Sequence, residues 1–147
     1  MNAKNSSTEF YTRILENLST AVFLLNEDLK VCYANPAAAI LLQSGHKRIL
    51  SSKLSRLFTQ YEHTLFNEFR SILENGHSYT QRDCEFELHN GAPLLVDCYV
   101  APHVINEERF LIIEMQAKDR LLRISREEQL HENQETAQIL IRGFAHE

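Results

Sequence analysis

The chain has 147 residues, 44% of them hydrophobic, which suits one ordinary domain with an appended element. Its formal net charge is −5, acids and bases are interspersed, and the one basic cluster, residues 46–48, is too small to form the stripe that binds a nucleic acid backbone. The longest apolar runs, residues 21–25 and 37–42, are shorter than the roughly 20 residues that cross a bilayer, and residues 1–7 contain no apolar signal segment, so we expect a cytoplasmic protein that binds neither nucleic acid nor membrane.

The N-terminal part predicts a polar tail over residues 1–8, followed by a flanking helix over residues 9–19. Ser6 and Glu9 have the spacing of a capping box, in which each side chain bonds to the backbone amide of the other residue. Apolar side chains then recur at helical spacing at Phe10, Ile14, Leu15 and Leu18. An amphipathic helix with an unusually apolar face is the expected result.

Two short strands are predicted next, over residues 21–25 and 30–34, with a polar hairpin loop between them. Asn35 and Pro36 then favour the start of a short helix, because Asn caps helices and Pro is tolerated at the first helical position. Residues 45–60 are expected to be loop, with a short helical stretch around Leu54, Leu57 and Phe58. A helix containing residues 66–73 should end at Asn75-Gly76.

A change to a two-residue period predicts a three-strand antiparallel meander. Cys84, Phe86 and Leu88 alternate with polar residues, and Asn90-Gly91 is a strong hairpin signal. The next strand, residues 94–101, places four side chains on one face: Leu94, Val96, Cys98 and Val100. A last strand covers residues 110–115. The order predicts an α+β fold with a five-stranded antiparallel sheet and short helices on one face.

The three cysteines, Cys32, Cys84 and Cys98, are widely spaced, so the sequence predicts no disulfide framework and no metal site. We expect reduced, buried thiols. The remaining segment, residues 119–147, contains no proline and predicts a long helix after a domain that spans residues 9–118. Its apolar stripe is modest, so it is expected to pair with a second copy of itself.

Two segments resemble known families. Residues 31–38, Val-Cys-Tyr-Ala-Asn-Pro-Ala-Ala, resemble the corresponding stretch of PAS domains. Residues 140–147, Leu-Ile-Arg-Gly-Phe-Ala-His-Glu, resemble the opening of the phosphoacceptor box of two-component histidine kinases, and are most similar to that of the nitrogen-regulation sensor kinases. Residues 14–22 also resemble the start of those kinases. Because family members continue through an ATP-binding domain, we expect this sequence to be a piece of a longer protein.

The resemblance implies a role for each of the last residues. His146 would be the phosphoacceptor and Glu147 would assist as acid or base, while ATP and Mg²⁺ would be bound by the parent protein. The helical wheel independently places His146 roughly opposite the apolar stripe of residues 130–144. The four glycines are isolated, so no phosphate-binding loop is predicted, and this chain alone should not autophosphorylate.

The resemblance also implies a homodimer, a response regulator of the NtrC kind and the nitrogen signal protein PII, the last acting through the catalytic region outside this sequence. The expected dimer interface comprises Phe10, Ile14, Leu15, Leu18, Leu122, Leu130 and Ala137. The module would set the geometry of the helix that carries His146. An alternative is a small-molecule-binding PAS module attached to another output, with His146 incidental.

A PAS pocket can hold haem, flavin or a metabolite, but neither haem nor flavin is expected here. His63 and His77 flank the helix where some haem-binding relatives place a ligand, and histidines at helix ends are usually solvated. The Asn-Cys-Arg context of the light-sensing flavin relatives is absent. Five aromatic side chains are candidates to fill the pocket: Phe23, Tyr33, Phe66, Phe69 and Tyr99. Whether any ligand binds stays open.

Overall fold

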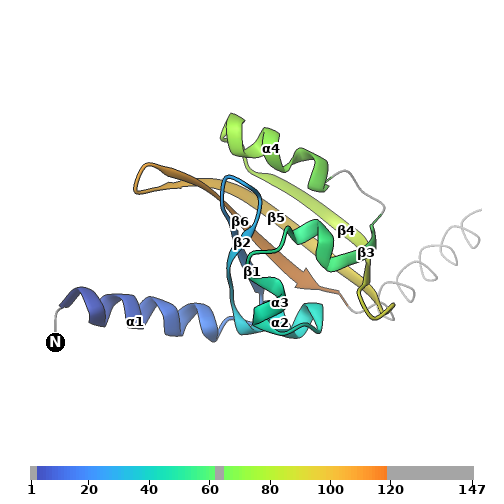
Figure 1. The fold of residues 1–147 in the computed structure, drawn as a ribbon, viewed down its shortest axis with the longest axis horizontal. Coiled ribbons are helices and arrows are strands. Elements are labelled where there is room, and N and C mark those ends of the chain that lie inside the picture. The colour runs from blue at the N-terminus through green and yellow to red at the C-terminus, as the bar shows by residue number, and fades with distance from the viewer. Residues whose placement is uncertain (1–2, 62–64, 119–147) are drawn as a thin grey trace, which may run out of the picture. The chain divides into compact units, whose positions relative to one another are not determined.

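The structure, a computed structural model, describes residues 3–61 and 65–118 (Figure 1). Its elements in chain order are α1 (Ala3–Glu16), β1 (Ala21–Leu25), β2 (Val31–Ala34), α2 (Pro36–Leu42), α3 (His46–Ile49), the 3₁₀ helix η1 (Leu54–Leu57), β3 (Phe58–Tyr61), α4 (Leu65–Asn75), β4 (Tyr79–Leu88), β5 (Pro93–Ile105) and β6 (Glu108–Ala117). This order confirms the predicted α+β class.

The strands form one antiparallel sheet in the order β2-β1-β6-β5-β4-β3. The described residues thus contain six strands, and the prediction of five was wrong because β3 was assigned to loop. This strand has only four residues and no alternating pattern. It is held by long-range contacts: Phe58 is buried against Phe86, and the Thr59 hydroxyl donates to Glu87 Oε1 at 2.9 Å.

The core lies between the helices and one face of the sheet, in a single cluster of buried side chains. Helix α4 contacts β5 and β6, while α2 contacts β1 (Figure 1). The predicted alternation is confirmed, since Val96, Cys98 and Val100 of β5 are all buried. An aromatic stack fills the space under α4: the ring of Phe86 lies 4.4 Å from Phe58 and 5.6 Å from Phe66, centroid to centroid. Such pairs contribute about 0.5–1.5 kcal/mol each beyond area burial.

The start of α2 and the end of α4 agree with the sequence signals, whereas α3 lies in a stretch expected to be loop and the bounds of α1 differ from those predicted. Asn35 caps α2, and α4 ends at Asn75, with Gly76 at φ +74°. Helix α1, however, covers Ala3–Glu16, so the bounds expected for the polar tail, residues 1–8, and for the flanking helix, residues 9–19, were wrong. Ala and Lys at residues 3 and 4 are good helix formers, so helix propensity favours a start before the apolar repeat. The preference for capping residues at Ser6 did not decide where the helix starts.

The cysteines divide into a buried pair and one exposed thiol. Cys84 and Cys98 are buried on adjacent strands, next to a β-bulge in which Asp83 adopts φ +55°. A hydrogen bond between these two thiols lowers the pKa of Cys84; the same contact, with burial, raises the pKa of Cys98. Cys32 is exposed on the edge strand β2 and donates to the Leu24 carbonyl at 3.2 Å, so the expectation that it is buried was wrong.

In a thiol-reactivity assay on the native protein, we therefore expect one thiol per chain, that of Cys32, to react promptly. Partial burial raises the pKa of Cys32, so its reaction at neutral pH should be slower than that of free cysteine and should accelerate as the pH rises. The variant Cys32→Ser should show no prompt reaction until the protein is denatured. Prompt labelling of two or three thiols in the native protein would contradict the burial of Cys84 and Cys98.

Candidate functional site

Several residues that the sequence singled out lie outside the described residues. They are the proposed phosphoacceptor His146 and its neighbour Glu147, together with three of the expected interface residues, Leu122, Leu130 and Ala137. Their roles stay predictions. The described part of the chain instead defines how the flanking helix is attached to the domain, and this junction is the candidate functional site.

Helix α1 and the turn that follows it carry an exposed apolar stripe, which we define as Phe10, Tyr11 and Ile14 of the helix and Leu18 of the turn. Phe10 and Tyr11 are 62% and 64% exposed, and Ile14 and Leu18 are 45% and 40% exposed. The predicted interface residue Leu15 is half-buried. Sequence reasoning missed Tyr11, although its spacing of three residues from Ile14 places both on one helix face. A contiguous exposed apolar surface of this kind is typical of an interface.

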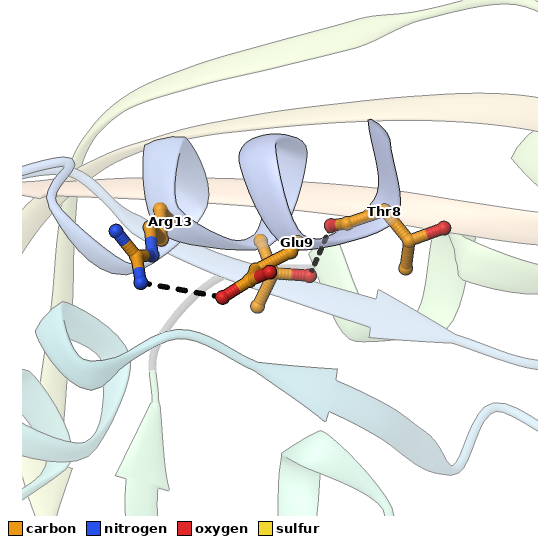
Figure 2. A network of polar contacts seen from close by, with 4 residues as sticks. Thr8, Glu9 and Arg13 are labelled. Carbon is orange, nitrogen blue, oxygen red and sulfur yellow. Dashed lines mark hydrogen bonds and ion pairs between the residues drawn. The ribbon is translucent and has the colours of Figure 1, made fainter. Parts of the chain in front are cut away.

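The other side of α1 is polar and carries hydrogen bonds between residues four positions apart (Figure 2). Arg13 Nη2 lies 3.2 Å from Glu9 Oε1, and the Thr12 hydroxyl donates to the Thr8 carbonyl at 2.8 Å. The Arg13 and Glu9 side chains are 74% and 59% exposed. An ion pair at this spacing contributes about 0.3–0.5 kcal/mol. The helix therefore depends on what its apolar stripe and its C-terminal end contact.

The C-terminal end of α1 is attached through Asn35, whose side chain is fully buried. Its Oδ1 accepts hydrogen bonds from the backbone amides of Val22 and Ala38, at 2.9 and 3.0 Å. Its Nδ2 donates to the carbonyls of Leu15 and Thr20, at 3.0 and 2.9 Å. One carboxamide thus connects the last turn of α1, the start of β1 and the start of α2.

These four bonds use the full capacity of the Asn35 side chain, which has two N–H donors and two acceptor positions on oxygen. Aspartate could replace only the two acceptor bonds. The capping of α2 was predicted from the sequence; the bonds to residues 15, 20 and 22 were not, because they join segments that are distant along the chain. The Asn35 side chain therefore bonds the end of α1 to the start of β1 in the sheet.

A groove of about 350 Å³ lies beside this junction. Leu18 and Ser19 line it from the α1 side, Ile40 and Leu41 from α2, and Ala117 from the end of β6. Ile40 is 76% exposed, which is unusual for a large apolar side chain. The junction, the groove and the end of the last strand therefore lie together.

The space between the helices and the sheet, where PAS domains hold ligands, contains the buried side chains of Phe23, Phe66 and Phe69, as expected. Tyr99 does not contribute, because it alternates with the inward-facing Cys98 and Val100 and is 39% exposed. Tyr33 is half-buried, and its hydroxyl has no hydrogen-bond partner among the residues that the structure describes. Burial, together with nearby Glu16, raises the pKa of Tyr33.

Within residues 3–61 and 65–118 no group of three or more His, Cys, Asp or Glu side chains is placed to hold a metal ion. His77 is exposed, and His63 lies outside the described residues. None of the helices described is both long enough and apolar enough to span a membrane.

Comparison with known proteins identifies the family. A family model described as the PAS fold matches residues 9–120. The chain is 35% identical over 140 residues to the sensory histidine kinase/phosphatase NtrB of Vibrio alginolyticus, covering 95% of this chain and 39% of that protein. It is 29% identical over 138 residues to NtrB of Proteus hauseri, covering 92% and 38%. The chain thus spans about two fifths of the length of these curated relatives.

Solved structures of PAS domains support the same family assignment. The crystal structure of the PAS domain of nitrogen regulation protein NR(II) from Vibrio parahaemolyticus is 32% identical, with a TM-score of 0.63, and the match covers 73% of this chain and 96% of that one. A PAS domain from a two-component sensor histidine kinase gives a TM-score of 0.66 at 17% identity, which shows the fold alone. The predicted resemblance is confirmed, and the chain belongs to the PAS family, with a PAS domain similar to those of NtrB histidine kinases.

Proposed function

We propose that this chain is the signal-input and dimerisation module of a cytoplasmic two-component histidine kinase that controls nitrogen-regulated transcription. The observation that carries the proposal is the extent of the similarity to NtrB. A generic PAS match ends at residue 120, whereas the alignment to the Vibrio alginolyticus protein covers 95% of the chain and therefore includes most of the segment after the PAS domain.

The junction supports a mechanism in which helix pairing controls the output. In a homodimer, the exposed apolar stripes of two α1 helices would pair, and Asn35 would hold the end of each α1 on β1 and α2. A change in helix pairing would then displace the start of the sheet rather than be absorbed by a loose linker. All five residues of β1 pair with Leu111–Met115 of β6, and the sequence that follows β6 contains His146.

The chemistry proposed for the parent protein is phosphoryl transfer from ATP to a ring nitrogen of His146. The neutral imidazole is the nucleophile, and the Glu147 carboxylate would hold the other ring N–H as positive charge develops. Another part of the parent protein would bind ATP and Mg²⁺. The phosphoryl group would pass to a response regulator of the NtrC kind, and PII would act on the catalytic region.

Replacement of Asn35 tests the junction. Asn35→Ala should lower the free energy of unfolding by about 3 kcal/mol, because it removes the side-chain cap of α2 and the side-chain hydrogen bonds to the Val22 amide and the Thr20 carbonyl. Asn35→Asp keeps the two acceptor bonds and should selectively expose the end of α1 to hydrogen exchange, while α2 stays protected. Urea unfolding and amide exchange measure these effects.

Asn26→Ala is the matched control, since Asn26 bonds only in an exposed turn. Equal losses for the two alanine variants would contradict the role of Asn35.

The dimer is tested on α1. Ile14→Glu combined with Leu18→Glu should convert the protein to a monomer in sedimentation at roughly 50 µM, a range in which weak dimers are populated, and should leave the sheet folded. Thr8→Glu combined with Thr12→Glu adds the same charge to the polar side of α1 and should leave the dimer intact. A wild-type chain that sediments as a monomer at this concentration would exclude α1 as a self-sufficient dimer interface.

The phosphoacceptor is tested in the parent kinase. Incubation with ATP should yield an acid-labile, base-stable phosphate, as a phosphorus–nitrogen bond requires, and His146→Gln should abolish it while changing stability by no more than about 0.5 kcal/mol. His131→Gln is the control in the same segment and should label normally. Glu147→Gln should slow labelling without weakening ATP binding. Full labelling of His146→Gln would leave only the alternative, a PAS module with another output.

A further inference from the structure

The exposed apolar stripe continues into the groove beside the junction. Leu18 belongs to the stripe and also lines the groove, whose other apolar lining residues include Ile40 of α2 and Ala117 of β6. Ile40 is among the most exposed large apolar side chains of the described residues, so the wall of the groove opposite Leu18 is open to solvent. The stripe and the groove therefore form one continuous apolar surface that runs from the middle of α1 onto α2.

The stripe alone is too small for a stable homodimer interface. A standard interface buries about 800 Å² on each partner. A fully covered aromatic side chain buries roughly 150–250 Å², and Phe10 and Tyr11 are only 62% and 64% exposed. Ile14 and Leu18 contribute less, because under half of each side chain is exposed. A homodimer that uses the stripe needs further contact surface, and the groove is the surface that adjoins it.

Symmetry limits how two stripes can meet. In a two-fold dimer every contact is made twice, since a residue that meets a second residue of the other copy is met in turn by its own counterpart. A parallel pair in register places each stripe residue beside its own copy. Phe10 then stays about 9 Å, six residues at 1.5 Å each, from Glu16, the last residue of α1 and a lining residue of the groove. Parallel pairing therefore leaves the groove uncovered by α1.

An antiparallel pair brings α1 of one copy to the groove of the other. With the two-fold axis at Ile14, in the middle of the stripe, Phe10 of each copy lies level with Leu18 of the other. Helical side chains lean toward the N-terminus of their own helix, and in an antiparallel pair this direction points past Leu18 toward the groove. Ser6 and Ser7, one turn before Phe10, are small and leave room for a close approach.

We propose that α1 pairs antiparallel with α1 of a second copy and inserts the ring of Phe10 into the groove of that copy, between Leu18 and Ile40. This inference rests on the homodimer of the proposed function and specifies its geometry. The Phe10 ring is oriented by an edge-to-face contact with Tyr11, at 5.7 Å between centroids. Because Ala117 lines the groove at the end of β6, the inserted ring lies beside the last strand of the other copy.

Disulfide cross-linking between introduced cysteines tests the orientation. In a Cys32→Ser background, which removes the exposed thiol, chains with Phe10→Cys are mixed with differently tagged chains with Leu18→Cys and oxidised with copper–phenanthroline. The mixture should give at least about tenfold more cross-linked heterodimer than either variant gives homodimer, because a disulfide forms only where the two Cα atoms lie within about 7 Å. Ile14→Cys should cross-link to its own copy and is the positive control.

A charge in the groove tests the insertion of the ring. Ile40→Glu should raise the dissociation constant of the dimer about tenfold in sedimentation, because it places a carboxylate against the Phe10 ring of the other copy. Val104→Glu is the matched control. Val104 is 71% exposed, close to the 76% of Ile40, and lies on β5 outside the groove. This variant should change the constant less than about twofold.

The outcomes distinguish this proposal from the proposed function. A wild-type monomer at roughly 50 µM would refute the dimer of the proposed function, and this proposal with it. A dimer in which Phe10→Cys and Leu18→Cys each cross-link to their own copy would overturn only the antiparallel arrangement, as would equal effects of Ile40→Glu and Val104→Glu. An Ile40→Cys thiol that stays shielded from reagent after dilution to monomers would show that the groove is filled within one chain, which also overturns the proposal.

Discussion

The carboxamide of Asn35 is the contact on which the arrangement of this domain depends. The side chain is completely buried, yet it binds four backbone groups that belong to α1, β1, the connection between them and α2. The Ala38 amide and the Leu15 carbonyl also take part in backbone hydrogen bonds, so the Val22 amide and the Thr20 carbonyl depend most on this side chain. Asn35 is also the only buried polar residue among those described. The core elsewhere is held by packing, which tolerates small shifts, whereas this junction is held by directional bonds.

The two faces of the sheet differ because side chains alternate along each strand. Alternation along β5 directs Cys98 and Val100 into the core and Tyr99 to the other face. The inner face is closed by α2, α4 and the aromatic stack, so the domain gains most of its stability there. The segment from β2 to η1 is tied to the core by apolar anchors, and it presents only basic side chains among its charged groups. Packing and charge are therefore carried by different residues of the same elements.

Local patterns predicted the parts of the fold that local physics determines. The alternation of Cys84, Phe86 and Leu88 and the hairpin at Asn90-Gly91 identified β4 and β5, because a two-residue period and positive φ values are properties of neighbouring residues. Strand β3 was not predicted because it has only four residues and is stabilised by pairing with residues near position 87. The role of Asn35 was half predicted: the α2 cap is local, while its bonds to Leu15 and Thr20 cross 20 and 15 positions.

Helix α1 shows why those distant bonds matter for the proposed function. It has 14 residues, close to the length of about 12–15 below which isolated helices are marginal in water. Its own side-chain pairs add little, so its stability must come from the Asn35 junction at one end and from whatever covers the exposed stripe along its length. The Asn35 junction and the contact that covers the stripe both stabilise α1. They are therefore thermodynamically linked, and each strengthens the other. A partner that orders α1 strengthens its attachment to β1 and α2, and a change in the domain that weakens this attachment weakens the pairing of α1.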